Sequence, residues 1–284
     1  MTDYVVPPML SWQEFIDAAK APETIQGGAR TWDDEWASVS WDEALRLAVD
    51  GWPLALREAD VTVAALRERA GLGVSAITLE PTWDVTGSEV DIGVYLAGVP
   101  ECMVDAVPRR TSRRGRVVTF LVPAAYSNYA SHEEVQNRGL ALATLSTAII
   151  EAGHSVEVWS GWAGWTGENL EDRYSGVAKV ISAGEPFDVG RLIFAVAHPA
   201  MCRRLWHSVW DAQPAPVARQ MEASNYARPP FECRPEDLPD GIADPYVFPF
   251  LQPDDPQWTS LDAAMSWCHE MFADLGLIEQ ALAH

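Results

Sequence analysis

The chain has 284 residues, 48% of them hydrophobic, and a formal charge of −21 at pH 7. This length provides for one large domain or two small ones with a sizeable core, and the negative charge argues against a surface that follows nucleic-acid phosphates. The sequence predicts neither export nor membrane insertion, because it has no basic start before an apolar run and no stretch of about 18 apolar residues. Four cysteines without a C-x-x-C pair are typical of reduced thiols, so we expect a cytoplasmic protein.

Residues 1–70 are predicted to form a mostly helical N-terminal region. Ser11 and Ser40 each begin a Ser-x-x-Glu pattern, in which the serine caps the first turn of a helix and the glutamate reaches back to the cap. A further helix is expected over 53–70, because proline is favoured in a first turn and a hydrophobic face follows it.

A small connecting segment of mixed α and β structure is predicted at 71–115. Its pattern is extended over 74–83, helical over 89–98 and extended again over 101–107. It runs into RRTSRRGR, an arginine-rich stretch in a chain that has only two lysines. A solvated loop is the favoured interpretation, and a site for phosphate or an acidic partner is the alternative. The residues of that alternative site are Arg109, Arg110, Arg113 and Arg114.

An α/β domain is predicted at 116–284, with a central sheet flanked by helices. Its patterns follow one another in the order strand, helix, strand, strand, helix. A proline-rich excursion after residue 210 holds one short strand, and an amphipathic helix comes last. The predicted elements are strands at 116–124, 155–161, 176–182 and 246–251, and helices at 131–152, at 187–197 and from residue 260 onward.

Four stretches of the chain carry a family resemblance: SVSWDEALRLAVDGWP, VDIGVYLAGVPECM, EEVQNRGLALATLSTAIIEAGHSVEVW and GEPFDVGRLIFAVAHPAMCRRL. Together they resemble an uncharacterised family of proteins encoded by bacteriophages and by mobile elements such as plasmids. The latter half is also similar to a von Willebrand factor A-type domain, in which a hydrophobic strand, a loop and a long helix follow one another. This resemblance implies a Rossmann-like sheet flanked by helices, with the helical N-terminal region packed on it.

The loop after the strand 116–124 corresponds, in this resemblance, to the metal motif Asp-x-Ser-x-Ser of A-type domains. One carboxylate and two hydroxyls there supply oxygen ligands for a hard divalent cation. Ser131 matches the last serine, but Ser127 stands in the place of the aspartate and Tyr129 in that of the middle serine. Without the carboxylate Mg²⁺ or Ca²⁺ would bind weakly, so we expect no metal and no cofactor here, and we expect Ser131 to cap its helix.

Two other groups of polar residues are candidates for chemistry. The first, His198, Cys202 and His207, has spacings that suit zinc. A proline breaks the helix within it, and free cysteine is commonly a small buried hydrophobe, so zinc is not expected. The second is a charged set on apolar helices, for which a structural ion pair is favoured over a catalytic one. Its members are Arg138, Asp188, Arg191 and His198.

Trp159, Trp162 and Trp165 recur at every third position in a glycine-rich stretch just past a predicted strand. Rings that line the core or the seam with the N-terminal helices are the favoured interpretation, and a platform for a sugar, a base or a peptide is the alternative. If an exposed surface binds a partner, we expect it to combine this stretch with the loop after the first strand of the α/β domain. That loop contributes Tyr126, Ser127, Asn128, Tyr129 and Ser131.

The sequence contains no nucleophile elbow, phosphate loop, dinucleotide fingerprint or zinc-protease motif. We therefore expect a non-enzymatic accessory protein of a phage or mobile element, acting through protein–protein interaction of a von Willebrand A-like domain. One alternative is a metal- or nucleotide-dependent hydrolase that uses Asp188, Arg191 and His198 near Ser127. Another is a virion or assembly component with tryptophans at its subunit contacts.

Overall fold

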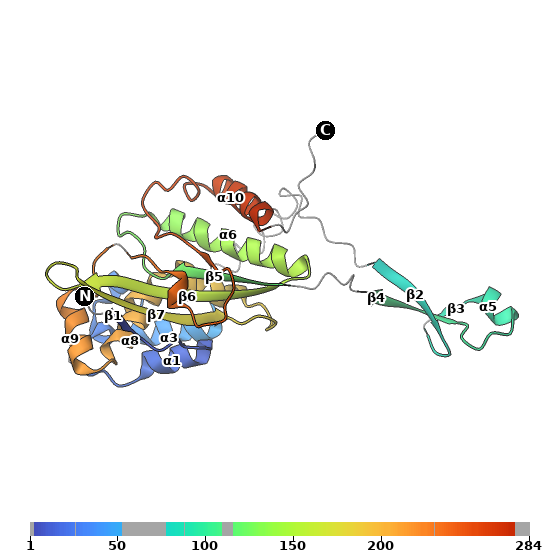
Figure 1. The fold of residues 1–284 in the computed structure, drawn as a ribbon, viewed down its shortest axis with the longest axis horizontal. Coiled ribbons are helices and arrows are strands. Elements are labelled where there is room, and N and C mark those ends of the chain that lie inside the picture. The colour runs from blue at the N-terminus through green and yellow to red at the C-terminus, as the bar shows by residue number, and fades with distance from the viewer. Residues whose placement is uncertain are drawn as a thin grey trace.

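A five-stranded mixed sheet forms the centre of the fold in the computed structural model (Figure 1). The structure describes residues 3–25, 27–52, 78–87, 89–109, 116–229 and 231–275. The strand order is β1-β7-β6-β5-β8; β6 and β7 pair antiparallel, and the other neighbours pair parallel. The strands are β1 (Asp3–Val5), β5 (Val117–Pro123), β6 (Ser155–Thr166), β7 (Asp172–Ile181) and β8 (Tyr246–Val247). With its helices this is an α/β fold, consistent with a Rossmann-like arrangement.

Several helices of the body begin at a side-chain cap that the sequence predicts. Ser11, Ser40 and Ser131 each accept a hydrogen bond from the backbone N–H three residues further on. At Ser131 the capping box is complete, because its own N–H donates to Glu134 Oε2 at 2.6 Å. The helices of the body are α1 (Trp12–Lys20), α2 (Asp34–Ala37), α3 (Trp41–Asp50), α6 (His132–Glu151), α7 (Val189–Ala197), the π-helix η2 (Met201–Trp206), α8 (His207–Asp211), α9 (Ala215–Ala223) and α10 (Leu261–Asp274).

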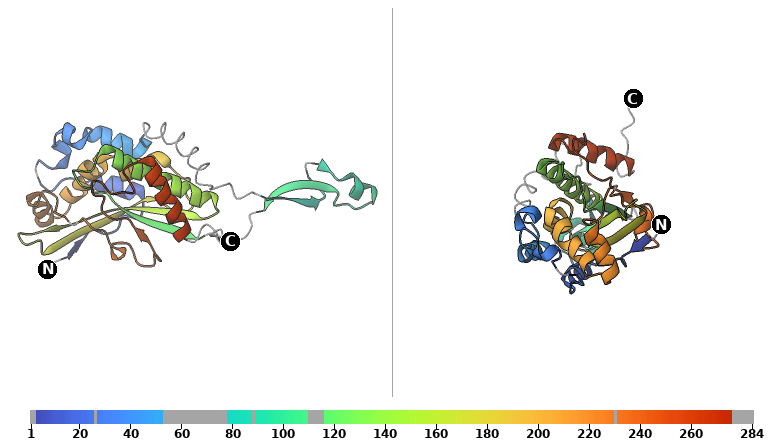
Figure 2. Two further views of the ribbon diagram at one scale, coloured as in Figure 1. Left: turned by 90° about the horizontal axis from the view of Figure 1, so that it is seen from above. Right: turned by 90° about the vertical axis from the view of Figure 1, so that its left-hand side faces the viewer.

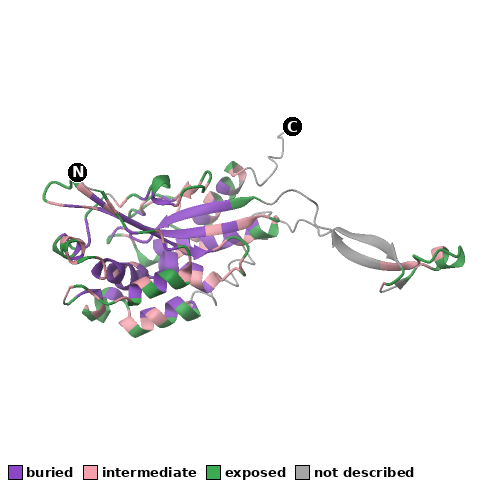
Figure 3. Cartoon of the chain, turned by 60° about the horizontal axis from the view of Figure 1, so that its bottom comes forward, coloured by how far each residue is buried: buried purple, intermediate pink, exposed green. Residues whose placement is uncertain are grey.

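The two faces of the five-stranded sheet are covered differently. The helices of the body lie together over one face, as the view from above shows (Figure 2). On the other face, Leu121 and Trp159 pack against Cys233 and Leu238 of the proline-rich segment. The middle strands are therefore buried on both faces of the sheet, although helices cover only one face and the proline-rich segment covers the other (Figure 3).

The described part of the N-terminal region is joined to the α/β body. β1 extends the sheet by pairing parallel with β7, for example at Tyr4 and Tyr174. α1 packs on α8, and α3 packs on α7. Trp12 Nε1 donates to Ala48 O at 2.8 Å, which ties α1 to α3. These helices thus share one core with the sheet.

A second, three-stranded sheet projects away from the body (Figure 1). Its strands pair antiparallel in the order β2-β4-β3, and a short helix follows β3. Asp91 caps that helix, because its Oδ1 accepts hydrogen bonds from the N–H groups of Gly93 and Val94. The elements are β2 (Thr78–Asp84), β3 (Glu89–Val90), α5 (Ile92–Leu96) and β4 (Met103–Arg109). Residues 78–109 are termed the arm below.

The structure departs from the sequence-based expectation at several places. α9 lies within the segment after residue 210 that was expected to hold only one short strand, and β1 joins the sheet from the region expected to be mostly helical. The predicted glycine and tryptophan loop after residue 161 is wrong, because β6 continues to Thr166 and pairs with β7 over this stretch. The strand expected at 246–251 is only β8. Pro199 does interrupt α7, and the chain resumes as the π-helix η2 rather than as a regular helix.

Some expectations fall outside the described residues. These are the helix expected over 53–70 and the side chains of Arg110, Arg113 and Arg114, whereas Arg109 is the last residue of β4. Among the residues that are described, none of the helices combines the length and apolar character needed to cross a membrane.

Candidate functional site

Four segments meet at the carboxyl edge of β5. The loop 124–131 leaves β5 there and enters α6. α7 returns to the same edge, because β7 runs antiparallel to β6 and ends at the opposite one. An added Cβ on Gly139 would lie 2.9 Å from Cβ of Ala197, so the second turn of α6 and the last turn of α7 are in close contact. The π-helix η2 follows directly after α7. In open α/β sheets ligands commonly bind at this edge.

The two serines of the loop serve the backbone. Ser127 Oγ accepts a hydrogen bond from Tyr129 N at 3.3 Å, and Ser131 Oγ accepts one from Glu134 N at 3.1 Å. The predicted capping role of Ser131 is therefore confirmed. Asn128 and Tyr129 are exposed beside them. No cluster of three metal-ligating His, Cys, Asp or Glu side chains occurs in the described part of the chain.

Arg138 brings a buried positive charge to this edge. The residue is 1% exposed, and its Nη2 donates to Val196 O at 2.9 Å, near the end of α7. Its Nε and Nη1 atoms are buried and have no hydrogen-bond partner among the described residues. Burial lowers the pKa of Arg138 to about 10, while the charges of Tyr126 and Asp255 raise it. The guanidinium therefore stays protonated at neutral pH.

Tyr126 connects the loop to the charges around it. Burial raises the pKa of its hydroxyl to about 12. The positive charges of Arg203 and Arg138 lower that pKa, and Cys202 raises it.

Cys202 and His207 form a pair across the π-helix. Their Sγ and Nε2 atoms lie 3.8 Å apart. Burial raises the pKa of the Cys202 thiol to about 11 and lowers that of His207 to about 3. At neutral pH the pair is a neutral thiol beside a neutral imidazole, which differs from the thiolate pair of a cysteine nucleophile. We refer to Tyr126, Arg138, Cys202, Arg203 and His207 together as the carboxyl-edge site.

The side chain of Arg203 extends toward an exposed tryptophan. Its Nη1 donates to Trp36 O at 2.6 Å, and its Cζ lies 4.8 Å from the centre of the Trp36 ring. Trp36 is 42% exposed and also lies against His207, with ring centres 6.1 Å apart. This indole therefore forms the outer wall of the carboxyl-edge site.

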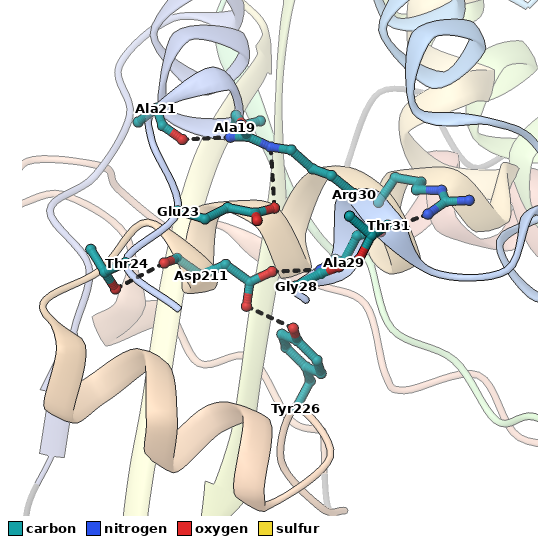
Figure 4. Close-up of polar contacts among 11 residues, drawn as sticks. Ala19, Ala21, Glu23, Thr24, Gly28, Ala29, Arg30, Thr31, Asp211 and Tyr226 are labelled. Carbon is teal, nitrogen blue, oxygen red and sulfur yellow. Dashed lines mark hydrogen bonds and ion pairs between the residues drawn. The ribbon is translucent and has the colours of Figure 1, made fainter. Parts of the chain in front are cut away.

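A second, buried polar cluster is centred on Asp211 and Tyr226 (Figure 4). The Tyr226 ring stacks on His207 with centres 4.0 Å apart, and Tyr226 Oη donates to Asp211 Oδ1 at 2.6 Å. Asp211 Oδ2 accepts a hydrogen bond from Ala29 N at 2.8 Å, and Asp211 O accepts one from Thr24 N. Burial raises the pKa of both Asp211 and Tyr226. The cluster ties the 24–29 segment to the end of α8.

The family model of a domain of unknown function, DUF7192, matches residues 2–279. The chain belongs to the DUF7192 family. Membership of an uncharacterised family, expected from the sequence, is thereby confirmed. No curated protein and no solved structure matches the chain. What this DUF7192 protein can bind or catalyse is set by its residues and their geometry.

The charged set expected on the apolar helices is not one cluster in the DUF7192 chain. Asp188 caps the start of α7 and forms there the expected structural ion pair with Arg191, at 3.7 Å; Arg191 also pairs with Glu185 at 3.0 Å. His198 lies at the other end of α7, where its Nδ1 accepts a hydrogen bond from Ala200 N and its ring stacks on Phe194. Arg138 is near that second end only. The structure thus does not assemble the acid, base and arginine set of the hydrolase alternative around Ser127.

The three tryptophans considered as a platform belong to β6. Trp159 and Trp162 are each 1% exposed, and Trp165 is partly buried. Trp159 faces the proline-rich segment, whereas Trp162 lies 5.1 Å from Trp210 on the helical face. Their interpretation as core residues is confirmed for Trp159 and Trp162, and a flat exposed platform of all three is not formed.

Sequence reasoning missed several residues of the site. Trp36 is more than 160 positions from Arg203, Asp211 and Tyr226, and the four residues match no motif of fixed spacing. The run CRR at the end of a predicted apolar helix was the one available signal, because charges next to a buried helix need partners. It did not indicate which partners those would be.

His207 predicts a pH dependence of stability. Its pKa is lower in the folded state than in the unfolded chain, so the unfolded state binds more protons between about pH 6.5 and the folded value, and stability falls as the pH falls through that window. Between pH 7 and pH 5, wild type should lose about 2 kcal/mol more of its free energy of unfolding than His207→Phe. Urea unfolding at both pH values measures this. Parallel losses in the two proteins would contradict it.

Proposed function

We propose that the protein is a non-enzymatic accessory protein of a phage or mobile element that acts by binding a partner protein on its arm. The observation that carries this proposal is that six large hydrophobic side chains of the arm are between 42% and 78% exposed. Exposed large apolar side chains that recur within 15 residues of the chain are a candidate interaction site. They are Val85, Val90, Ile92, Tyr95, Leu96 and Val99.

The charge of the arm indicates the chemistry of the partner. Residues 78–109 include six acidic residues and one basic residue, a net charge of −5. A second copy of the chain would bring a like-charged arm and its own charge of −21, so repulsion opposes pairing between copies. The partner inferred here presents an apolar patch with a rim of Lys and Arg side chains, since complementary charges fix orientation and speed association.

Two features of the body support a binding role. The Cys202–His207 pair is neutral, so it lacks the activated nucleophile that an acyl-transfer enzyme needs. The order of β5, loop, α6 and a parallel β6 suits the proposed likeness to a von Willebrand A-type domain, whose metal motif is altered here at Ser127. In this proposal the body is a scaffold that presents the arm.

Cross-linking from the arm provides the test. A photoreactive residue in place of Leu96 is expected to capture one protein in the cells that make this chain, and the same residue in place of Leu10 is not. Leu10 is the matched control, because it is a 54% exposed leucine on the body. With the captured protein purified, Ile92→Ser combined with Leu96→Ser should weaken binding about 30-fold, or about 2 kcal/mol, whereas Leu10→Ser should not weaken it.

Two outcomes would overturn the proposal. Equal binding by the arm variant and by Leu10→Ser would show that the apolar group does not contribute. Cross-links that join two copies of the chain would favour an assembly component instead. If the partner has a basic rim, its binding to the arm should weaken as the salt concentration rises, because salt screens the charges at the rim.

A further inference from the structure

The short helix of the arm carries its exposed apolar side chains on one side. At about 100° per residue, Ile92, Tyr95 and Leu96 of α5 fall within about 100° of the helix circumference. These three side chains are between 62% and 78% exposed. Val99, also exposed, completes the spacing i, i+3, i+4, i+7. This is the spacing of the anchors that an amphipathic helix inserts into a groove of another protein.

Hydrogen bonds fix this helical turn at both ends, although it has only five residues. Asp91 caps its start. At the other end Gly98 has a φ of 75°, and its N–H donates to Tyr95 O at 3.0 Å. Val99 N donates to Val94 O at 3.3 Å, which completes a Schellman motif. Five residues in isolation are too few to stay helical in water, so the two caps make the turn a preformed shape.

The strands of the arm are less suited to the other common mode of recognition, in which a partner adds a strand to a sheet edge. The edge strand β2 has Pro81 opposite Ala106, and β4 has Pro108 opposite Leu79. β3 pairs with the first two residues of β4, which leaves Pro108 beyond it. Proline occurs in a strand where its nitrogen points away from the paired strand. Each outer edge therefore lacks an N–H donor at its proline.

We propose that the partner protein receives the arm through α5, as a preformed helical turn that inserts Ile92, Tyr95 and Leu96 into an apolar groove. This inference rests on the proposed function and narrows the partner's surface from an apolar patch to a groove with a basic rim. The convex face of a helix buries its side chains best in a concave surface. Because the turn is already capped, little ordering of the chain opposes binding.

The charge around α5 favours a protein groove over two other apolar surfaces. Residues 89–102 include three acidic residues and no Lys or Arg, a net charge of −3. An anionic membrane and a second copy of this acidic chain would both repel that segment. A groove with Lys and Arg side chains at its rim would attract it.

Cross-linking position by position on the full chain tests this mode of binding. A photoreactive residue is placed in turn at Ile92, Tyr95, Leu96, Ala97 and Val85 in the cells that make the chain. Capture of one protein is expected from the first three positions. Ala97 is the matched control, because it is exposed and lies about 140° from Ile92 around the helix. Val85 is an exposed control in the arm outside α5.

The pattern of capture, and not capture alone, decides the outcome. Equal capture from Ala97, or capture from Val85 alone, would overturn the helical mode and leave the arm as a binding element. No capture from any of the five positions would contradict the proposed function as well. Cross-links between two copies would overturn the proposal, and so would binding to phosphatidylcholine vesicles that Leu96→Ser abolishes.

Cap variants test whether the helical shape matters. Asp91→Ala removes the cap and leaves the apolar face unchanged, and it should weaken binding to the captured protein about 5-fold. Asp91→Asn removes the same charge but keeps a capping oxygen, so it should bind within about 2-fold of wild type. Equal weakening in the two variants, with urea unfolding of the body unchanged, would overturn the helical mode, because charge alone would explain it.

Discussion

Replacing Arg204 by methionine is expected to lower the free energy of unfolding by about 3 to 5 kcal/mol. The Arg204 side chain is fully buried, and its three nitrogens donate to the carbonyls of Ala29, Trp32 and Val39 at 2.6 to 3.1 Å. Nη2 also reaches Asp34 Oδ1 at 2.6 Å. Methionine fills much of the space but leaves these carbonyls without a donor. Asp34 is largely exposed, so water can solvate it and its share of the loss is small.

Urea unfolding followed by tryptophan fluorescence measures the Arg204 effect, because Trp206 and Trp210 are buried close to it. Arg46→Met is the matched control, since Arg46 pairs with Glu43 on the surface of α3 and exposed pairs contribute little. Hydrogen exchange provides a local readout: the amides of 29–39 should exchange faster in Arg204→Met. A loss no larger than that of Arg46→Met would show that the 29–39 segment is held by other contacts.

The sequence predicts the local part of this fold well, because its signals are local. The caps at Ser11, Ser40 and Ser131 follow from a hydroxyl and a carboxylate three residues apart, and the structure forms all three. The alternating and 3.6-residue patterns locate β5, α6 and α7 to within about two residues. The partner of a strand lies elsewhere in the chain, so a local pattern does not reveal it. The end of β6 was misplaced for this reason, because its glycines and tryptophans are typical of a loop and only the pairing with β7 makes them a strand.

The candidate site depends on contacts that a linear pattern does not contain. Arg204 reaches residues 165 to 175 positions away, and Asp211 reaches Ala29 across 182 positions. Neither pair has a spacing that a motif could specify. Arg138 was identified from the sequence because a charge in an apolar helix is anomalous. Of the two ion pairs expected for Asp188, the one with Arg138 was wrong, since Asp188 lies at the far end of α7, where it forms the other, with Arg191, at 3.7 Å.

Replacing Asp211 by alanine should lower the free energy of unfolding by about 3 kcal/mol, because it removes the acceptor of two buried donors. Ala29 N and Tyr226 Oη both donate to this carboxylate, at 2.8 and 2.6 Å (Figure 4). Asp211→Asn should recover most of the loss, since an amide can accept from Ala29 N and donate to the tyrosine oxygen. That recovery would show that the loss of stability comes from the hydrogen bonds of Asp211 and not from its charge. Asp240→Ala, at an exposed position, is the control and should change little.

A double-mutant cycle then assigns the loss to the Asp211 and Tyr226 pair. Tyr226→Phe alone removes the hydroxyl donor, and adding it to Asp211→Ala removes an orphaned group, so the double variant should be more stable than the sum of the single losses predicts. A coupling of about 1 to 2 kcal/mol is expected for groups in direct contact. Additive losses would mean that the hydroxyl finds another partner once the carboxylate is gone. The remaining effect of Asp211→Ala would then belong to Ala29 N, which places the anchoring of the 24–29 segment on that single backbone contact.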